Sequence, residues 1–211
     1  MEILDESCSD IGPSFAEITP LSIFHAEWSN LQLGRDILDN SLRIEVAAHW
    51  TSTPPLPSFS GEYRIPAPME ILGQDASRLA SMLSDDFHKK FVTQLRYFDN
   101  TYASGRGFAA YLRMNPESTR REIWFHDLVA TETPPYPPGF TILDLTFNQY
   151  VEALTLTKGL YGWQYLFADI SFQDPAIDHL AAGLRDGLEA FSELFTDQDY
   201  SSLLQRLEAR L

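Results

Sequence analysis

The chain has 211 residues, 44% of them hydrophobic and 13% aromatic, and a formal net charge of −15 at pH 7. The apolar fraction is large enough to build a core, which excludes a chain that is disordered throughout. The charge repels phosphate backbones and argues against nucleic-acid binding, whereas it favours a basic protein partner. An acidic surface that serves solubility alone is the commoner explanation of such a charge.

The sequence carries no signal for a membrane or an export route. No apolar run reaches the roughly 18 residues of a membrane span. The segment MEILDESCSD lacks the basic and apolar regions of a signal peptide, so we expect a cytoplasmic protein that does not associate with a membrane. Cys8 is the only cysteine, which excludes an intramolecular disulfide and a thiolate zinc site. We expect a flexible tail over residues 1–12 and one α+β domain over residues 13–211.

The first expected elements are strands. Residues 21–28, LSIFHAEW, fit a short helix or a strand, and we favour the strand. Residues 41–50, SLRIEVAAHW, show the period of two that is typical of a half-buried strand. A proline-rich loop follows over 51–62. Residues 63–72, YRIPAPMEIL, indicate a short edge strand that runs into a turn.

A helical pattern begins at Asp75. Its apolar residues recur at spacings near three and four as far as Leu95, which predicts a helix with a break at Ser84-Asp85. Either residue at the break is a suitable N-cap for a second helical segment. The glycines of SGRG, residues 104–107, then predict a turn.

The middle of the chain predicts a β-hairpin over residues 107–127. Alternate residues from Phe108 to Met114 are apolar, the segment Asn115-Pro116-Glu117-Ser118 has the composition of a turn, and Ile123 and Phe125 belong to the returning strand. A proline loop over 133–139 and a short strand over 141–145 follow.

The segment that follows has the pattern of a capped helix. Thr146 is a natural N-cap, and apolar residues then form one stripe: Phe147, Tyr150, Val151 and Leu154. Lys158 followed by Gly159 is typical of a helix C-terminus, because glycine adopts positive φ and a cation favours the helix dipole. The pattern predicts a helix of about three turns that packs on the sheet.

Helices are expected to close the chain. Residues 160–172 indicate a turn of helix that enters irregular structure. Asp174 as cap and Pro175 at the first helical position predict a helix from there, with a last helix over 197–211. The sequence therefore predicts an α+β fold with a mostly antiparallel central sheet, flanking helices and a helical extension from about residue 174.

The aromatic residues allow two interpretations. The four tryptophans lie within apolar runs, so core packing is favoured over a carbohydrate-binding platform. They are Trp28, Trp50, Trp124 and Trp163. The aromatic-rich segment 160–172 would form an interface if the protein were a structural subunit.

Motifs of catalysis are absent from the sequence. It contains no glycine-rich phosphate loop, no G-x-S-x-G nucleophile elbow and no H-E-x-x-H zinc motif. We therefore expect a protein that is not an enzyme and has neither a cofactor nor a metal. Adjacent carboxylates such as Asp85-Asp86 are expected by chance in so acidic a chain, and they suit a helix start.

Two histidine pairs leave an enzymatic alternative open. His25 and Glu27 would lie on the same face of a strand and reach one cleft, whereas His126 and Asp127 would point to opposite faces. The alternative function is a small hydrolase or transferase that uses His25 with Glu27, or His126. Hydrogen-bonded histidines without a chemical role are the commoner outcome.

From Phe108 to Gly159 the order of elements resembles the C-terminal half of SUKH superfamily domains. The resemblance is carried by a strand that ends in WFHD, then a loop, a short strand and the helix in TFNQYVEAL. Upstream, YRIPAPMEIL resembles the strand and proline-then-acidic turn of that family. The similarity covers roughly half of the chain.

The resemblance implies an α+β domain without catalysis. Members of that family commonly act as immunity proteins that bind and block nuclease-type toxins, and others are regulatory interaction modules. It implies that exposed carboxylates occupy the cationic cleft of a basic toxin and block it sterically and electrostatically. The acids at loops and helix ends expected to bind such a partner are Asp85, Asp86 and Asp99.

Overall fold

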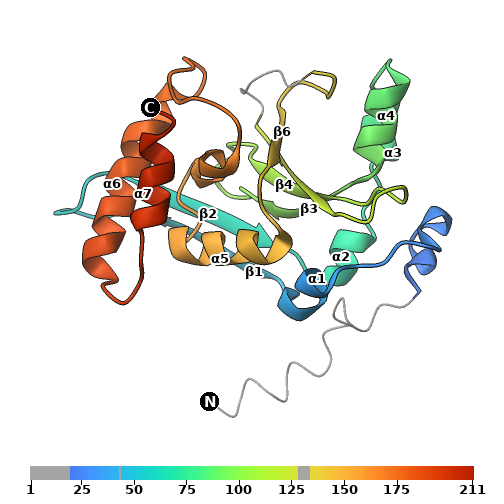
Figure 1. The fold of residues 1–211 in the computed structure, drawn as a ribbon, viewed down its shortest axis with the longest axis horizontal. Coiled ribbons are helices and arrows are strands. Elements are labelled where there is room, and N and C mark those ends of the chain that lie inside the picture. The colour runs from blue at the N-terminus through green and yellow to red at the C-terminus, as the bar shows by residue number, and fades with distance from the viewer. Residues whose placement is uncertain (1–19, 43, 128–133) are drawn as a thin grey trace, which may run out of the picture.

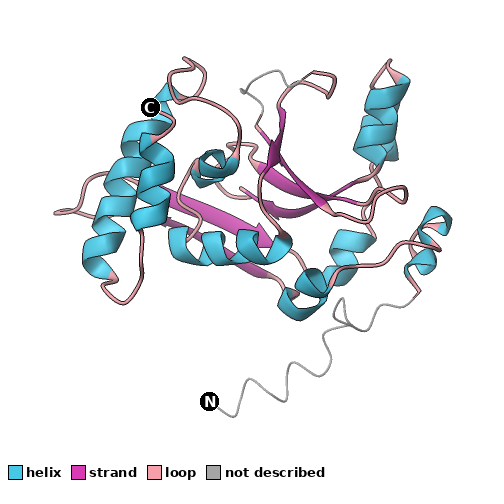
Figure 2. Cartoon of the chain, in the orientation of Figure 1, coloured by secondary structure: helices cyan, strands magenta, loops and turns pink. Residues whose placement is uncertain are grey.

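The computed structural model describes residues 20–42, 44–127 and 134–211, which form an α+β protein (Figures 1 and 2). Its strands make one two-stranded and one four-stranded antiparallel sheet, and two helices stand at the C-terminal end. The expected fold class, with a mostly antiparallel sheet, flanking helices and a helical C-terminus, is confirmed. The expected tail over residues 1–12 lies outside the described residues, as does Cys8.

The two sheets follow one another along the chain. In the smaller sheet, β1 (Val46–Thr51) pairs with β2 (Ser60–Ile65), and Trp50 lies opposite Gly61. The larger sheet has the order β3-β4-β5-β6. Its strands are β3 (Leu95–Asn100), β4 (Ala109–Arg113), β5 (Glu122–His126) and β6 (Phe140–Leu143).

Helices occupy both ends of the molecule. In Figure 1, α6 and α7 stand side by side at one end, and α3 and α4 stand at the other. In the described ranges, the 3-10 helices are η3 (Leu21–Ile23), η4 (Ala26–Trp28) and η5 (Trp163–Phe167). The α-helices are α1 (Arg35–Asn40), α2 (Pro68–Leu72), α3 (Ser77–Ser81), α4 (Asp86–Thr93), α5 (Phe147–Thr157), α6 (Asp178–Leu194) and α7 (Ser201–Glu208).

The expected hairpin is confirmed as β4 and β5, which pair from Ala109 with His126 to Arg113 with Glu122. The turn begins where expected, since the Ser118 amide donates to the carbonyl of Asn115 at 3.2 Å. The alternate apolar residues of the first strand are all buried. They are Phe108, Ala110, Leu112 and Met114.

Helix α5 forms as its sequence predicts. The Thr146 hydroxyl accepts from the Gln149 amide, and the Gln149 side chain accepts from the Thr146 amide at 2.8 Å, which makes a capping box. At the other end, Lys158 and Gly159 have positive φ of 53° and 71°. The indole of Trp50 donates to the Lys158 carbonyl at 2.8 Å. This hydrogen bond connects the C-terminal end of α5 to β1.

Residues 21–28 are not a strand, which corrects that expectation. They form η3 and η4, with the Phe24 amide donating to the Leu21 carbonyl at 3.0 Å and Trp28 to His25 at 2.9 Å. Leu21 and Trp28 are both buried and lie seven residues apart. This spacing is compatible with helical turns and also with two separate apolar contacts. The strand expected over 41–50 begins only at Val46.

The helix expected from Asp75 to Leu95 is broken as predicted but ends earlier. It consists of α3 and α4, and the Asp85 carboxylate caps α4 by accepting from the His88 amide at 2.8 Å. Strand β3, which the sequence analysis missed, starts at Leu95. Leu95 packs with Phe91 and Val92 of α4, so its apolar character continues the helical pattern although its backbone is extended.

Two further boundaries differ from expectation. Asp174 caps a turn rather than the helix: its carboxylate accepts from the Ala176 amide at 2.9 Å, and its carbonyl accepts from Ile177 and Asp178. Helix α6 therefore begins at Asp178. The turn expected after Pro66 is helix α2, because Pro68 occupies the first helical position, where its missing amide proton is not needed.

A continuous apolar core extends from Leu21 to Leu207. It includes Leu184 and Leu188 of α6, both fully buried, so the C-terminal helices belong to the core and are more than an appendage. Trp28, Trp124 and Trp163 are buried, and Trp50 packs against the core, which confirms the packing interpretation of the tryptophans. The 160–172 segment is also largely buried, so most of its aromatic residues belong to the core and not to an interface.

No helix in the described part of the chain is long and apolar enough to cross a membrane.

Candidate functional site

Two of the predicted partner-binding acids lie at the exposed start of α4. The Asp85 carboxylate accepts from the His88 amide, and Asp86 forms an ion pair of 2.9 Å with Lys89. The Asp86 side chain is 95% exposed, and the hydrogen bond from Lys89 lowers its pKa. Both acids are accessible, but one serves as a helix cap and the other is partly neutralised by its neighbour.

Asp99 cannot contact a partner, which corrects the third expectation. It is only 3% exposed. One carboxylate oxygen accepts from the Tyr150 phenol of α5 at 2.7 Å, and the other accepts from the Arg64 amide of β2 at 3.1 Å. Burial raises the pKa of Asp99 to about 7. Asp99 therefore joins β3 to α5 and to β2 and has a structural role.

Glu62 is a second buried acid, which sequence reasoning missed. It is 3% exposed in β2, and its carboxylate accepts from the Ser104 amide at 3.2 Å and from the Tyr161 phenol at 3.1 Å. The alternation of β2 is obscured by Gly61, so the inward direction of Glu62 has no clear sequence signal.

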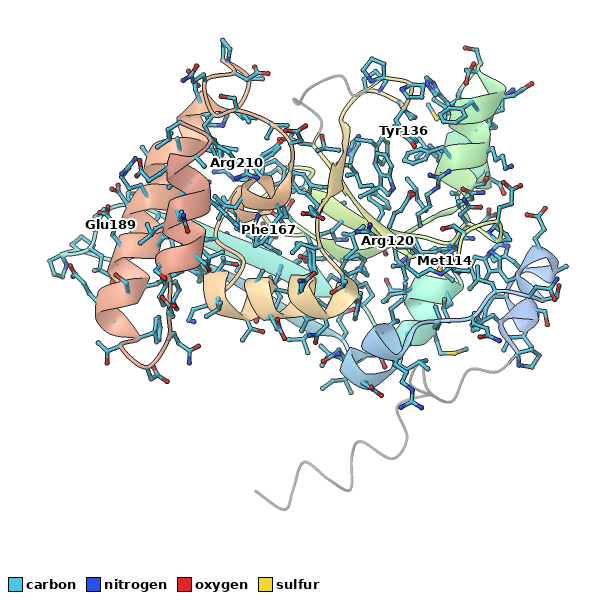
Figure 3. All side chains as sticks on the ribbon, in the orientation of Figure 1. Met114, Arg120, Tyr136, Phe167, Glu189 and Arg210 are labelled. Atoms are coloured by element: carbon cyan, nitrogen blue, oxygen red, sulfur yellow. The ribbon has the colours of Figure 1, made fainter. Side chains whose placement is uncertain are left out.

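His25 and Glu27 do line one cavity, although they are not on a strand. The cavity has a volume of about 450 Å³ and lies between η4, α4 and β3, with Asp75, Lys90 and Arg96 among its other lining residues. Met114 also lines it, and Figure 3 labels this residue on the side of the molecule where η3 and η4 lie.

Arg96 is the most unusual residue of this cavity, because a long cationic side chain is almost fully buried at 1% exposure. One terminal nitrogen donates to the carbonyls of Thr93 and Leu95 at 2.8 and 2.7 Å. The other lies 2.7 Å from Nε2 of His25. The guanidinium also stacks on the Trp28 ring, at 4.8 Å from its centroid.

This contact fixes the chemical state of His25. Arginine only donates hydrogen bonds, so Nε2 of His25 accepts one and carries no proton. Burial, with the charge of Arg96 as the next cause, lowers the pKa of His25. The nitrogen that a general base would use is thus already occupied by Arg96.

The structure does not bring His126 into this cavity. His126 belongs to β5 and packs against Phe140 with 4.5 Å between ring centroids, and burial lowers its pKa. The neighbouring Asp127 is buried and accepts from the Tyr165 phenol at 2.5 Å. The two histidine sites predicted as alternatives are therefore separate, and His126 contributes to packing beside the β5–β6 pair.

A second hollow is an apolar groove of about 460 Å³ where the β1–β2 sheet meets the C-terminal end of α6. Its apolar lining residues include Trp50, Leu56, Phe191, Leu194 and Phe195. Leu194 is 57% exposed. We refer to this feature as the α6 groove.

A cation lines the α6 groove, and two exposed acids lie close to its apolar residues in the sequence. Lys158 lines it, and its ammonium lies 4.0 Å from the centroid of the Phe195 ring. Burial lowers the pKa of Lys158, while the nearby charge of Asp197 acts in the opposite direction. Glu193 and Asp197 are exposed and flank the apolar pair Leu194-Phe195 in sequence. The only sequence signal for this groove is the adjacent apolar pair Leu194-Phe195. The buried face of the helix requires only one of these two residues to be apolar.

Within the described ranges, no group of three or more histidine, cysteine or acidic side chains could hold a metal ion.

No family model, curated protein or solved structure matches the chain. The similarity to SUKH domains stays a prediction that rests on the sequence segments quoted above.

Proposed function

We propose that the protein is a non-catalytic binding module of the immunity type, which neutralises a basic, nuclease-like toxin by steric and electrostatic blocking. The observation that carries this proposal is the α6 groove, whose apolar residue Leu194 is exposed and lies in the sequence between the exposed acids Glu193 and Asp197. Protein interfaces commonly have an apolar core with a polar rim. A basic partner would place an apolar side chain against Leu194 and its own cations beside Glu193 and Asp197.

The charge of α6 and of the loop after it supports a basic partner. Along α6 and the loop that follows, Glu189, Glu193, Asp197 and Asp199 are exposed. Glu189 is labelled in Figure 3 on the outer side of α6, away from the sheets. With the net charge of −15, these groups would attract a cationic protein over several ångströms and accelerate its association.

Blocking requires no chemistry from this chain. Carboxylates that occupy the cationic cleft of a nuclease take the place of the substrate's phosphates. The apolar contact at the α6 groove slows dissociation of the complex. Because rim charges act mainly on the association rate, the interaction should weaken as salt screens them.

Asp85 and Asp86 offer a second acidic surface for the same function. They lie on α4, at the end of the molecule opposite α6 (Figure 1). The two surfaces are far enough apart that a partner's dependence on one or the other can be measured separately.

The test is capture of a partner from lysate of the source organism, followed by assay of its nuclease activity with and without this protein. The wild-type protein should retain a basic partner at low salt, lose it at high salt and inhibit its activity. Glu193→Lys with Asp197→Lys should weaken binding at least about tenfold by reversing two charges. Asp85→Asn with Asp86→Lys, which preserves the helix cap, is the matched variant.

Each outcome has a distinct meaning. Loss of binding only in the α4 variant would move the interface to α4 and overturn the groove assignment. Binding that is indifferent to both variants and to salt would overturn the proposed function itself.

A hydrolase that uses His25 and Glu27 is a second candidate, because both residues line one cavity. It is weaker, since Arg96 occupies Nε2 of His25. His25→Gln, which preserves an acceptor for Arg96, should abolish any hydrolytic activity if His25 is the base. Unchanged neutralisation of the partner by this variant would support the binding function instead.

A further inference from the structure

Arg96 is a buried cation without a carboxylate partner. Among the residues that the structure describes, no carboxylate lies within ion-pairing distance of its guanidinium, and its Nε–H has no hydrogen-bond acceptor. Burial lowers the pKa of Arg96 to about 10. The charge of Asp75 and three hydrogen bonds offset part of the cost of burying this cation, and the Nε–H without an acceptor leaves donor capacity for an anion in the cavity.

The cavity beside Arg96 is large enough for a small molecule. Its volume of about 450 Å³ lies within the range of about 300–1,000 Å³ that is usual for ligand pockets. The backbone holds the arginine firmly, because Thr93 and Leu95 accept from one terminal nitrogen and Trp28 covers its face. With these contacts in place, the edge formed by Nε–H and the terminal nitrogen that faces His25 has donor capacity left for a planar carboxylate.

The remaining walls carry charges of both signs. Lys90, whose ammonium also pairs with Glu117 at 3.0 Å, adds a second cation, and Asp75 and Glu27 add two carboxylates. The carboxylates would repel polyanions such as nucleoside triphosphates. Their presence in the same cavity as two cations suits a ligand that itself carries one positive and one negative group.

We propose that this cavity binds a small zwitterion of the α-amino acid class, with the ligand carboxylate at Arg96 and Lys90 and its ammonium at Asp75 and Glu27. This site is independent of the proposed function, because the cavity and the α6 groove have no lining residue in common.

Trp28 provides a direct reporter of occupancy, since it lines the cavity and stacks on Arg96. The four tryptophans give four indole N–H signals in a ¹H–¹⁵N NMR spectrum, and Trp28→Phe assigns the one from Trp28. Each of the common α-amino acids is titrated separately into the full-length protein. Acetate and methylammonium, which each carry one of the two charges, are titrated in parallel.

At least one amino acid should shift the Trp28 signal saturably and leave the signal of Trp163 in place. Acetate and methylammonium should bind at least about tenfold more weakly, because each lacks one charged group. Absence of a saturable shift up to about 10 mM for every amino acid would overturn the proposal. Acetate that binds as tightly as the best amino acid would overturn the zwitterion assignment.

Variants of two adjacent lysines test the location. Lys90→Gln should weaken binding several-fold, whereas Lys89→Gln, which alters a lysine that does not line the cavity, should leave the affinity unchanged. Arg96→Lys should abolish binding, since it removes the planar fork. If Arg96→Lys does not fold, the comparison of Lys90→Gln with Lys89→Gln is the test. Equal affinities of these two variants for the amino acid would contradict the proposal.

Discussion

The phenol of Tyr150 in α5 donates a hydrogen bond of 2.7 Å to the buried carboxylate of Asp99 in β3. The same carboxylate accepts from the Arg64 amide of β2 at 3.1 Å. One acid thus connects the larger sheet, the smaller sheet and the helix that packs on them. Asp99 and Tyr150 therefore belong to the interior framework, and their properties should appear in the stability of the whole protein.

The first prediction concerns pH. Burial raises the pKa of Asp99 from 3.8 to about 7, so between these values the folded state binds a proton that the unfolded state does not. The contribution of Asp99 to the free energy of unfolding should therefore fall as pH rises from about 4 to about 7, then stay constant. The change should amount to about 1 to 4 kcal/mol.

Asp99→Asn, whose side chain does not titrate, should lack this contribution. Urea unfolding of both proteins at several pH values between about 4 and 8 measures the difference, in which the effects of other groups cancel. A stability difference between the two proteins that does not vary with pH would contradict the raised pKa.

The second prediction removes the other partner of that hydrogen bond. Tyr150→Phe leaves one oxygen of a buried carboxylate without its donor and should lower the free energy of unfolding by about 1–3 kcal/mol. Tyr102→Phe is the control, since Tyr102 is 51% exposed, and it should change stability by no more than about 0.5 kcal/mol. Equal effects of the two substitutions in urea unfolding would show that the hydrogen bond contributes little.

The third prediction separates backbone strain from steric contact at two glycines of similar φ. A Cβ at Gly159 would lie 2.8 Å from the Glu62 carbonyl oxygen, whereas a Cβ at Gly105 would meet nothing within 4 Å. Gly105→Ala should lower the free energy of unfolding by only about 1–2 kcal/mol, which is the cost of a left-handed backbone for a residue with a Cβ. Gly159→Ala should cost clearly more, because α5 and β2 must also move apart. Similar thermal unfolding midpoints for both variants would contradict the close contact.

The fourth prediction distinguishes the surface of the α6 groove from its floor. Leu194 is 57% exposed and Phe191 is 4% exposed. Leu194→Ala should change the free energy of unfolding by less than about 0.5 kcal/mol, whereas Phe191→Ala should lower it by about 3–5 kcal/mol. Chemical denaturation measures both values. A large loss for Leu194→Ala would mean that this side chain serves the fold and is not free to bind a partner.

The sequence predicted those elements whose signals are local. Thr146, Gln149 and Gly159 specify α5 through contacts within the helix or just beyond it, and the β4–β5 hairpin is specified by alternation and a turn. Strand β3 was missed because Leu95 continues the apolar spacing of α4. Residues 21–28 were assigned to a strand because a short apolar segment does not distinguish a strand from helical turns.

The candidate sites depended even more on tertiary contacts. The sequence left Ser84 and Asp85 as alternative helix caps, and the cap is made by Asp85 with His88, three residues away. Burial of Asp99 depends on Tyr150 and Arg64, which no local pattern connects to it. The cavity at Arg96 arises because η4 folds over β3. The Arg96 guanidinium and the His25 ring therefore meet only in the folded chain.

The packing of Phe191 on the β1–β2 hairpin also constrains how the protein is made in the cell. Trp50 and Phe59 lie 5.8 Å from Phe191, ring to ring, so this hairpin obtains its apolar cover only after most of the chain has been synthesised. A two-stranded hairpin is marginally stable by itself. Before Phe191 has been synthesised, we expect these rings to face the solvent and the strand edges to be unprotected, and we expect the nascent chain to bind holding chaperones and to aggregate when it is overproduced.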